Sequence, residues 1–255
     1  MIYYSMNHIV LIIICLLLCL KFISINKKET KKNNKIIIKN ILTKKEKINL
    51  KKGQLIMTDM LRLFNKICNE NNLKYWCVGG TLIGAVRHKG WIPHDADVDV
   101  AMLERDYKVL QLIINKYLPN YYWFQDKITD IYYSSNIGKI RYLNAYYSDC
   151  KNKKSHNGLQ LDIFVFKEKL EYLVPTINSF YFEKINRNMI FPLKKILFED
   201  IKVYVPNKYC EYLINGFGGC PPPELPKEEQ YPHEGRITFD VPKWMKDKYP
   251  RLYYK

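Results

Sequence analysis

Three aspartates, Asp95, Asp97 and Asp99, stand at every second position of residues 93–102. Alternate residues of a β-strand point to the same face, so this spacing predicts three carboxylates on one face of one strand. Such carboxylates repel one another unless a cation compensates them. Mg²⁺ and Mn²⁺ prefer oxygen ligands and often bridge protein carboxylates to substrate phosphates. The segment therefore predicts a metal-dependent site for phosphoryl transfer, with Asp97 and Asp99 as metal ligands.

The apolar residues of the same segment separate this prediction from its alternative, a solvated acidic turn. Val98, Val100 and Met102 fill the other set of alternate positions. A strand whose second face is apolar is half-buried, which a solvated turn is not. We therefore favour the strand.

Asp162 is the best candidate for a third carboxylate. In residues 158–166, leucine, isoleucine and valine alternate with Gln160, Asp162 and two phenylalanines, a pattern that predicts a strand. A charge in such apolar surroundings needs a partner or a metal ion. We therefore predict Asp162 as a catalytic residue and metal ligand, with an edge-strand carboxylate that faces water as the alternative.

A glycine pair precedes the aspartates. Gly79 and Gly80 follow an expected strand at residues 75–78, and a short helix is expected from Thr81 to Arg87. A glycine turn lets the backbone approach a phosphate, and a helix N-terminus offers it free N–H groups. We predict that Gly79, Gly80 and Thr81 bind substrate. Arg87 is predicted to clamp a phosphate, with a surface arginine at a helix C-terminus as the alternative.

The run from Gly79 to Met102 resembles the signature of the LicD/fukutin family, in which Gly-Gly, a short helix and Asp-hydrophobic-Asp follow one another. Two positions depart from the common Pro-Trp-Asp-Asp-Asp form: His94 replaces the tryptophan, and Ala96 replaces an aspartate. Ala96 is expected to face away from the carboxylates. His94 is predicted either to touch substrate or to be a packing substitution.

The resemblance extends to the C-terminal third and covers roughly residues 52–233. Residues 198–206 resemble the family's hairpin, residues 209–218 resemble its helix, and Pro221, Pro222 and Pro223 follow where the family has a proline pair. Glycine and proline stop helices, so these positions need no catalytic role.

The resemblance implies a nucleotidyltransferase fold and the transfer of a phospho-alcohol, such as phosphocholine or ribitol phosphate, from a CDP-linked donor onto a glycan. It implies that Asp97, Asp99 and Asp162 hold one or two Mg²⁺ ions on the diphosphate. Asp95 would be a further metal ligand or a base. Two alternatives stay open: nucleotidyl transfer from an NTP, and a catalytically inactive glycan-assembly protein.

Composition and charge bear on partners. The chain has 255 residues, 47% hydrophobic, enough for one sizeable core. Its net charge is +16, but residues 21–52 hold twelve lysines against Glu29 and Glu46 and so carry +10 of it. The rest of the chain is only mildly basic, which argues against nucleic acid as a partner.

Residues 9–25 are predicted as a membrane anchor, because an apolar run from Ile9 to Leu20 continues past Lys21. A cleaved secretory signal is the alternative. Residues 1–8 would be a short tail, 26–52 a tether rich in lysine and asparagine, 53–235 the catalytic domain and 236–255 a C-terminal tail.

Two arguments disagree about the side of the membrane on which the catalytic domain lies. The lysines after residue 25 favour a cytoplasmic domain. The eukaryotic relatives imply a single-pass type II protein with the domain in the lumen of the Golgi or endoplasmic reticulum, and this is the expectation we adopt. Outside the anchor, the cysteines Cys68, Cys77, Cys150, Cys210 and Cys220 fit no zinc site, and their odd number leaves at least one unpaired.

The remaining pattern predicts the elements that position the site. We expect a mixed α/β (α+β) domain in which helices flank a mixed sheet. Apolar spacing predicts helices at residues 55–68 and 106–117, strands at 121–124, 131–133 and 139–147, and a polar loop at 151–157.

Overall fold

The computed structural model describes residues 42–148, 155–177 and 183–254. Residues 42–225 and 232–254 belong to one compact unit, and residues 226–231, which carry the short 3₁₀ helix η2 (Lys227–Glu229), are not part of it. The predicted tail and anchor, residues 1–25, lie outside the described residues. Within the three described ranges, no helix has both the length and the apolar character that a membrane crossing needs.

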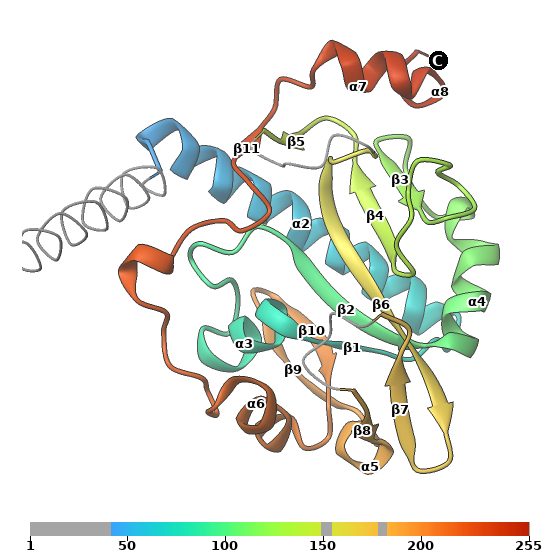
Figure 1. Cartoon of the computed structure of the whole chain (residues 1–255), viewed down its shortest axis with the longest axis vertical. Coiled ribbons are helices and arrows are strands. Elements are labelled where there is room, and N and C mark those ends of the chain that lie inside the picture. The colour runs from blue at the N-terminus through green and yellow to red at the C-terminus, as the bar shows by residue number, and fades with distance from the viewer. Residues whose placement is uncertain (1–41, 149–154, 178–182, 255) are drawn as a thin grey trace, which may run out of the picture. The chain divides into compact units, whose positions relative to one another are not determined.

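A mixed sheet forms the centre of the compact unit, as the sequence predicted (Figure 1). The path β1-β2-β6-β4-β3 contains one parallel pair, β2 with β6, and antiparallel pairs elsewhere. Two further strands continue it, since β7 pairs with the end of β6 and β8 pairs with β7. The bounds are β1 (Tyr75–Cys77), β2 (Val98–Leu103), β3 (Tyr122–Gln125), β4 (Gly138–Tyr142), β6 (Leu159–Lys169), β7 (Tyr172–Pro175) and β8 (Ile185–Asn186).

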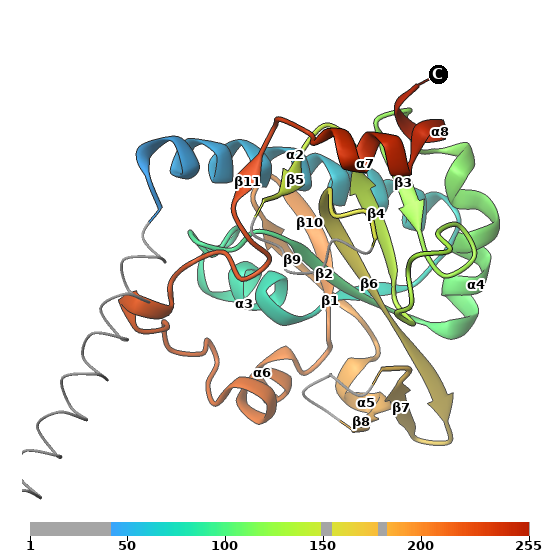
Figure 2. The same ribbon diagram turned by 45° about the horizontal axis from the view of Figure 1, so that its top comes forward.

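The long helix α2 (Lys44–Glu70) lies along the sheet (Figures 1 and 2). It begins eleven residues before Leu55, because Thr43 and Glu46 form a capping box: Thr43 N–H donates to Glu46 Oε2 at 2.7 Å, and Glu46 N–H donates to Thr43 Oγ1 at 3.2 Å. The expected start of the helix was therefore wrong, and residues 44–52 belong to the folded unit rather than to a tether. Buried side chains follow helical spacing, with Met57, Leu61 and Phe64 in the core.

Shorter helices and two small sheets complete the described part of the chain. The helices are α3 (Gly79–Arg87), α4 (Glu104–Ile113), η1 (Ile114–Lys116), α5 (Arg187–Ile190), α6 (Tyr209–Phe217), α7 (Lys243–Lys248) and α8 (Pro250–Tyr253). One small sheet is the hairpin of β9 (Lys194–Phe198) with β10 (Ile201–Val205); the other pairs β5 (Tyr146–Tyr147) with β11 (Ile237–Thr238). Helix α6 ends at Gly218, whose φ of +78° makes the expected left-handed cap.

Two of the expected strands differ from the structure. Residues 131–133 form no strand, and residues 131 and 132 lie in a turn. Two preceding aspartates accept hydrogen bonds from the backbone: Asp126 Oδ1 from Ile128 N–H at 2.8 Å, and Asp130 Oδ1 from Tyr132 N–H at 2.9 Å. The expected strand 139–147 is broken at residues 143–145 into β4 and β5.

The last residues are folded, so the expected C-terminal tail was also wrong. Val241, Met245 and Tyr249 form a second apolar cluster against which Trp123 packs. Tyr249 Oη donates to Asp130 Oδ2 at 3.0 Å, and Tyr253 Oη lies 2.7 Å from His156 Nε2. The predicted boundaries at residues 52 and 235 thus cut through elements of one packed unit.

Cysteine pairing is visible for four of the five cysteines outside the predicted anchor. Cys210 on α6 forms a disulfide with Cys220, whereas Cys68 and Cys77 are buried free thiols. Cys150 lies outside the described residues.

Candidate active site

Asp99 and Asp162 meet across the parallel strand pair. They are register partners on β2 and β6, and one carboxylate oxygen from each of Asp97, Asp99 and Asp162 lies within 4.8 Å of the others. The predicted group therefore assembles, although not on one strand. Strand β2 begins only at Val98, so Asp95 and Asp97 lie in the preceding loop. Three alternate carboxylates on one open strand would have repelled one another, and the bend separates Asp95 from Asp99.

The glycine pair lies directly against these carboxylates. Gly79 has a φ of +53°, and a Cβ atom there would lie 2.7 Å from Asp99 Oδ2. A Cβ atom on Gly80 would collide with the carboxylate of Asp95. A side chain at Gly79 would therefore be strained, and one at either position would displace a carboxylate of the site, so the N-terminal turn of α3 faces the acidic group. This geometry is suited to a phosphate held between helix N–H groups and a carboxylate-bound cation.

Thr81 has a structural contact that the sequence did not indicate. Its side chain is buried, and its Oγ1 accepts a hydrogen bond of 2.8 Å from Asp99 N–H. Thr81 thus fixes the backbone of a predicted metal ligand. The predicted contact of Thr81 with substrate stays a prediction.

The buried side chains Lys139, Arg141 and Gln160 complete the site and were missed. Lys139 Nζ donates to Asp162 Oδ2, and Arg141 Nη1 donates to Gln160 Oε1 at 2.7 Å. Gln160 Nε2 in turn donates to Asp97 Oδ2 at 3.1 Å. The signal was present in the sequence, because Lys139 and Arg141 are alternate residues of an expected strand and share its face.

An unpartnered atom tests whether a cation fits here. Asp162 Oδ1 is buried and has no hydrogen-bond partner, while Lys139 occupies the other oxygen. Buried carboxylate oxygens normally have a partner, and oxygen is the ligand that hard divalent cations prefer. The donor set of Asp97, Asp99 and Asp162 therefore fits a metal ion.

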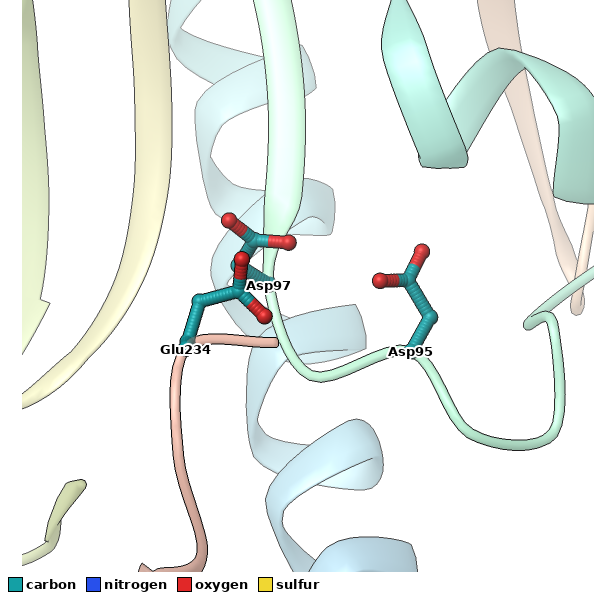
Figure 3. Close-up of side chains that lie close together, drawn as sticks. All are labelled: Asp95, Asp97 and Glu234. Carbon is teal, nitrogen blue, oxygen red and sulfur yellow. The ribbon is translucent and has the colours of Figure 1, made fainter. Parts of the chain in front are cut away.

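A second acidic group shares Asp97 with the first. One oxygen from each of Asp95, Asp97 and Glu234 lies within 4.8 Å of the others. Figure 3 shows the carboxylates of Asp97 and Glu234 side by side, with Asp95 on the loop beside them. Sequence analysis missed Glu234, since a single glutamate between a histidine and a glycine carries no periodic signal.

Burial and mutual repulsion disfavour the charged forms of these acids. Burial raises the pKa of Asp95 to about 7, and the neighbouring Glu234 adds to this shift. Burial, followed by the charge of Asp99, holds the pKa of Asp97 well above its usual range; burial and then Asp162 do the same for Asp99. Burial also raises the pKa of Glu234. Without a cation, burial and mutual repulsion therefore favour the protonated forms of these acids.

Tyr147 fixes the loop that carries Asp95 and Asp97. Its buried hydroxyl donates to Ala96 O at 2.6 Å and accepts from Gln160 N–H at 3.3 Å. The loop and β6 are therefore tied together between the two acidic groups. Ala96 itself is fully buried, consistent with the expectation that its side chain faces away from the carboxylates.

The predicted contacts of Arg87 and His94 with substrate stay predictions. Arg87 ends α3 as expected, but its Nη1 donates to the carbonyls of Pro222 and Pro223 at 3.0 Å each. Burial lowers the pKa of His94, and His233 and Arg87 lower it further. His94 is therefore a neutral hydrogen-bonding group at pH 7.

Comparison with known proteins agrees with this geometry. The family profile described as LicD/FKTN/FKRP, nucleotidyltransferase domain, matches residues 72–208, which include the glycine pair, Asp95, Asp97, Asp99 and Asp162. That range is more than half of the chain. It ends before Glu234.

Similar proteins occur in bacteria and in an animal. An uncharacterised protein of Rickettsia typhi is 29% identical over 67% of this chain and 48% of its own length. Lipopolysaccharide cholinephosphotransferase LicD of Haemophilus influenzae is 26% identical over 72% of this chain and 80% of its own length. Ribitol-5-phosphate transferase FKTN of Mus musculus is 27% identical over 63% of this chain and 32% of its own length.

The chain spans about half the length of the rickettsial relatives it matches. The profile match, however, covers the site and the strands that position it. The chain therefore belongs to the LicD/FKTN/FKRP family of nucleotidyltransferase-domain proteins.

Proposed function

We propose that this chain is a metal-dependent phosphotransferase that moves a phospho-alcohol from a CDP-linked donor onto a glycan. The observation that carries the proposal is the pairing of Asp99 with Asp162, whose free Oδ1 lies in a carboxylate group pressed against the Gly79–Gly80 turn. The transferred phospho-alcohol is of the phosphocholine or ribitol phosphate type, because two relatives are named for transferring these groups.

The residues fit a mechanism of direct displacement. The acceptor hydroxyl oxygen attacks the phosphorus that bears the alcohol and gives its proton to a base, for which Asp95 is the candidate. The P–O–P bond breaks, and CMP leaves with the bridging oxygen. Asp97, Asp99 and Asp162 would hold Mg²⁺ or Mn²⁺, which neutralises charge on the diphosphate when bound. The N–H groups of the α3 N-terminus donate to the phosphate, and Lys139 keeps Asp162 oriented. No covalent enzyme intermediate is required.

Donor profiling tests this function against nucleotidyl transfer. Purified protein is incubated with Mg²⁺, a glycan mixture and either CDP-choline, CDP-ribitol or each NTP. Phospho-alcohol transfer releases CMP and adds the phospho-alcohol mass to the glycan, whereas nucleotidyl transfer releases pyrophosphate. Pyrophosphate release without CMP would contradict the proposal. Absence of any turnover, together with intact binding of the glycan, would favour the non-enzymatic alternative.

We also propose that the domain lies in the lumen of the Golgi or endoplasmic reticulum, anchored as a type II membrane protein by residues 9–25. The disulfide between Cys210 and Cys220 supports this compartment, because disulfides persist in oxidising environments and are rare in the cytosol. Protease treatment of intact microsomes tests the proposal. Digestion of the domain without detergent would place it in the cytosol.

A further inference from the structure

The loop between β3 and β4 presents apolar side chains to solvent at its tip. Ile128 and Ile131 are 80% and 85% exposed, and Tyr132 is 47% exposed. Apolar residues scattered singly over a surface are common, but here two isoleucines and a tyrosine stand together on one tight turn. Residues 127–132 form this tip and are called the isoleucine turn.

Hydrogen bonds from two aspartates fix the isoleucine turn. Asp126 Oδ1 accepts from Ile128 N–H at 2.8 Å, and Asp130 Oδ1 accepts from Tyr132 N–H at 2.9 Å. Asp130 Oδ2 also accepts from Tyr249 Oη at 3.0 Å, which ties the turn to the folded C-terminal segment. The isoleucines are therefore held outward by a rigid turn rather than exposed by a loose loop.

The same hydrogen bonds remove negative charge from the surface of the turn. Asp126 and Asp130 are 5% and 2% exposed, so their carboxylates are shielded from solvent. Lys127, in contrast, is exposed, and Lys248 Nζ lies 3.9 Å from the centre of the Tyr132 ring. The outer surface is therefore apolar at its tip and positive beside it, although the sequence there contains two acids and only one lysine.

Helix α4 adds another exposed apolar side chain. Gln111 Nε2 donates to Asp126 Oδ2 at 2.7 Å, and the next residue, Leu112, is 80% exposed. Figures 1 and 2 show the loop between β3 and β4 beside α4. The exposed apolar side chains thus come from two neighbouring elements.

An anionic lipid bilayer fits this surface better than a protein partner does. Specific protein interfaces bury about 1,000 Å² or more of closely matched surface, which a turn of six residues does not offer. A few apolar side chains suffice to enter the boundary between headgroups and acyl chains. Lysines beside them attract anionic headgroups, and a tyrosine ring suits the same depth.

We propose that the isoleucine turn contacts an anionic lipid surface. Ile128 and Ile131 would enter the boundary of the bilayer, with Lys127 and Lys248 beside the headgroups. This contact belongs to the catalytic domain itself, and it depends neither on the proposed donor nor on an anchor at residues 9–25.

Photo-cross-linking to lipid tests the contact. The full-length chain is reconstituted with vesicles of phosphatidylcholine, with or without phosphatidylserine, that contain a phospholipid with a photoactivatable acyl chain. Mass spectrometry then locates the modified residues. The isoleucine turn should acquire lipid adducts, and more of them with phosphatidylserine. Leu170 is the matched control, because it is 98% exposed between β6 and β7 but lies among the glutamates Glu168 and Glu171.

Variants of exposed residues sharpen the result. Joint replacement Ile128→Asp and Ile131→Asp should leave the melting temperature unchanged and reduce adducts in the turn about tenfold or more. Lys127→Gln should reduce the gain from phosphatidylserine about fivefold, whereas Lys169→Gln should not change it.

Three outcomes would overturn the proposal. The first is labelling of the turn no stronger than that of Leu170, or undiminished in the double variant. The second is equal labelling with and without phosphatidylserine, which would reject an anionic surface. The third is cross-linking of the turn to another protein chain and not to lipid, which would assign the surface to a protein partner.

Discussion

Asp99 on β2 and Asp162 on β6 face each other as register partners in the parallel pair of the sheet. Parallel neighbours present equivalent positions on the same face, so both carboxylates point into the same space. The Asp99 backbone is fixed by the Thr81 hydroxyl, and the Asp162 carboxylate by Lys139. The two acids are therefore brought together by main-chain pairing and held by different neighbours.

Neutralising a central ligand should stop catalysis without unfolding the protein. In Asp97→Asn and Asp99→Asn, metal binding weakens while the repulsion among buried carboxylates decreases. We expect turnover to fall by about a hundredfold or more and the metal-free melting temperature to be unchanged or higher. Steady-state assays and thermal denaturation in EDTA measure the two effects. Activity above a tenth of wild type in both variants would remove the metal-site assignment.

Glycine substitutions should separate backbone strain from collision with the site. Gly79→Ala adds a side chain at a φ of +53° against Asp99, whereas Gly218→Ala adds one at a φ of +78° with nothing within 4 Å. Both should destabilise by about 1 kcal/mol or more through the left-handed backbone. Only Gly79→Ala should also lose Mn²⁺ binding and activity. Equal activity in the two variants would show that the turn does not shape the site.

Removing Lys139 should leave Asp162 as a buried charge without its ion partner. We expect Lys139→Met to lower the free energy of unfolding by about 3–5 kcal/mol in EDTA, as for other broken buried pairs. Saturating Mg²⁺ should recover much of that loss, because the cation supplies the missing charge. Urea denaturation with and without Mg²⁺ measures this.

A matched control for Lys139→Met is Lys66→Met. Lys66 forms an exposed pair of 3.8 Å with Glu70. Such pairs contribute about 0–1 kcal/mol, so the change should be small and indifferent to Mg²⁺. A Mg²⁺-independent loss in Lys139→Met would assign the lysine a purely structural role.

The pH dependence of stability should reveal the raised pKa of Asp95. Burial, and then Glu234, raise this pKa to about 7, against an unfolded value of about 4. Between these values the folded protein keeps a proton that the unfolded chain has lost, so the contribution of Asp95 to stability falls as pH rises. The stability of Asp95→Asn relative to wild type, measured in EDTA, should therefore increase from pH 5 to pH 8.

The comparison uses the difference in stability between Asp95→Asn and wild type, because this difference removes the contributions of other titrating groups. The pKa values of His88, His94 and His156 are lowered, chiefly by burial, and histidines of this kind make stability rise with pH. These contributions are common to both proteins and cancel. A constant difference in melting temperature across the range would contradict the assigned shift. Added Mg²⁺ should also reduce the difference, because bound carboxylates have already lost their protons.

The spacing of apolar residues and glycines predicted the elements whose pattern is visible within a short stretch of sequence. The strand of Asp99, the strand of Asp162 and the helix that ends at Arg87 were all found, because each has a clear periodicity and glycine punctuation. The turn at residues 131 and 132 was missed, because its apolar residues outweighed the turn-forming Asp126 and Asp130.

The remaining differences depend on contacts between distant segments. The early start of α2 rests on a capping box that apolar spacing does not show. Glu234 joins the site through the pairing of β11 with β5. Lys139 was placed on a strand, but its role depends on the register of β4 against β6, which puts it opposite Asp162. Register between non-adjacent strands cannot be read from one sequence.

The pairing of β11 with β5 also has a consequence for the order in which the molecule matures. Asp97 and Glu234 are separated by more than half of the 255-residue chain. During synthesis, the first carboxylate group can assemble once β6 has left the ribosome, whereas the second must wait until Glu234 and β11 have also emerged. Closing contacts of such long sequence separation is slow and entropically costly. A nascent chain should therefore form its two acidic groups one after the other. Translation arrested before β11 should yield a folded intermediate whose site lacks Glu234.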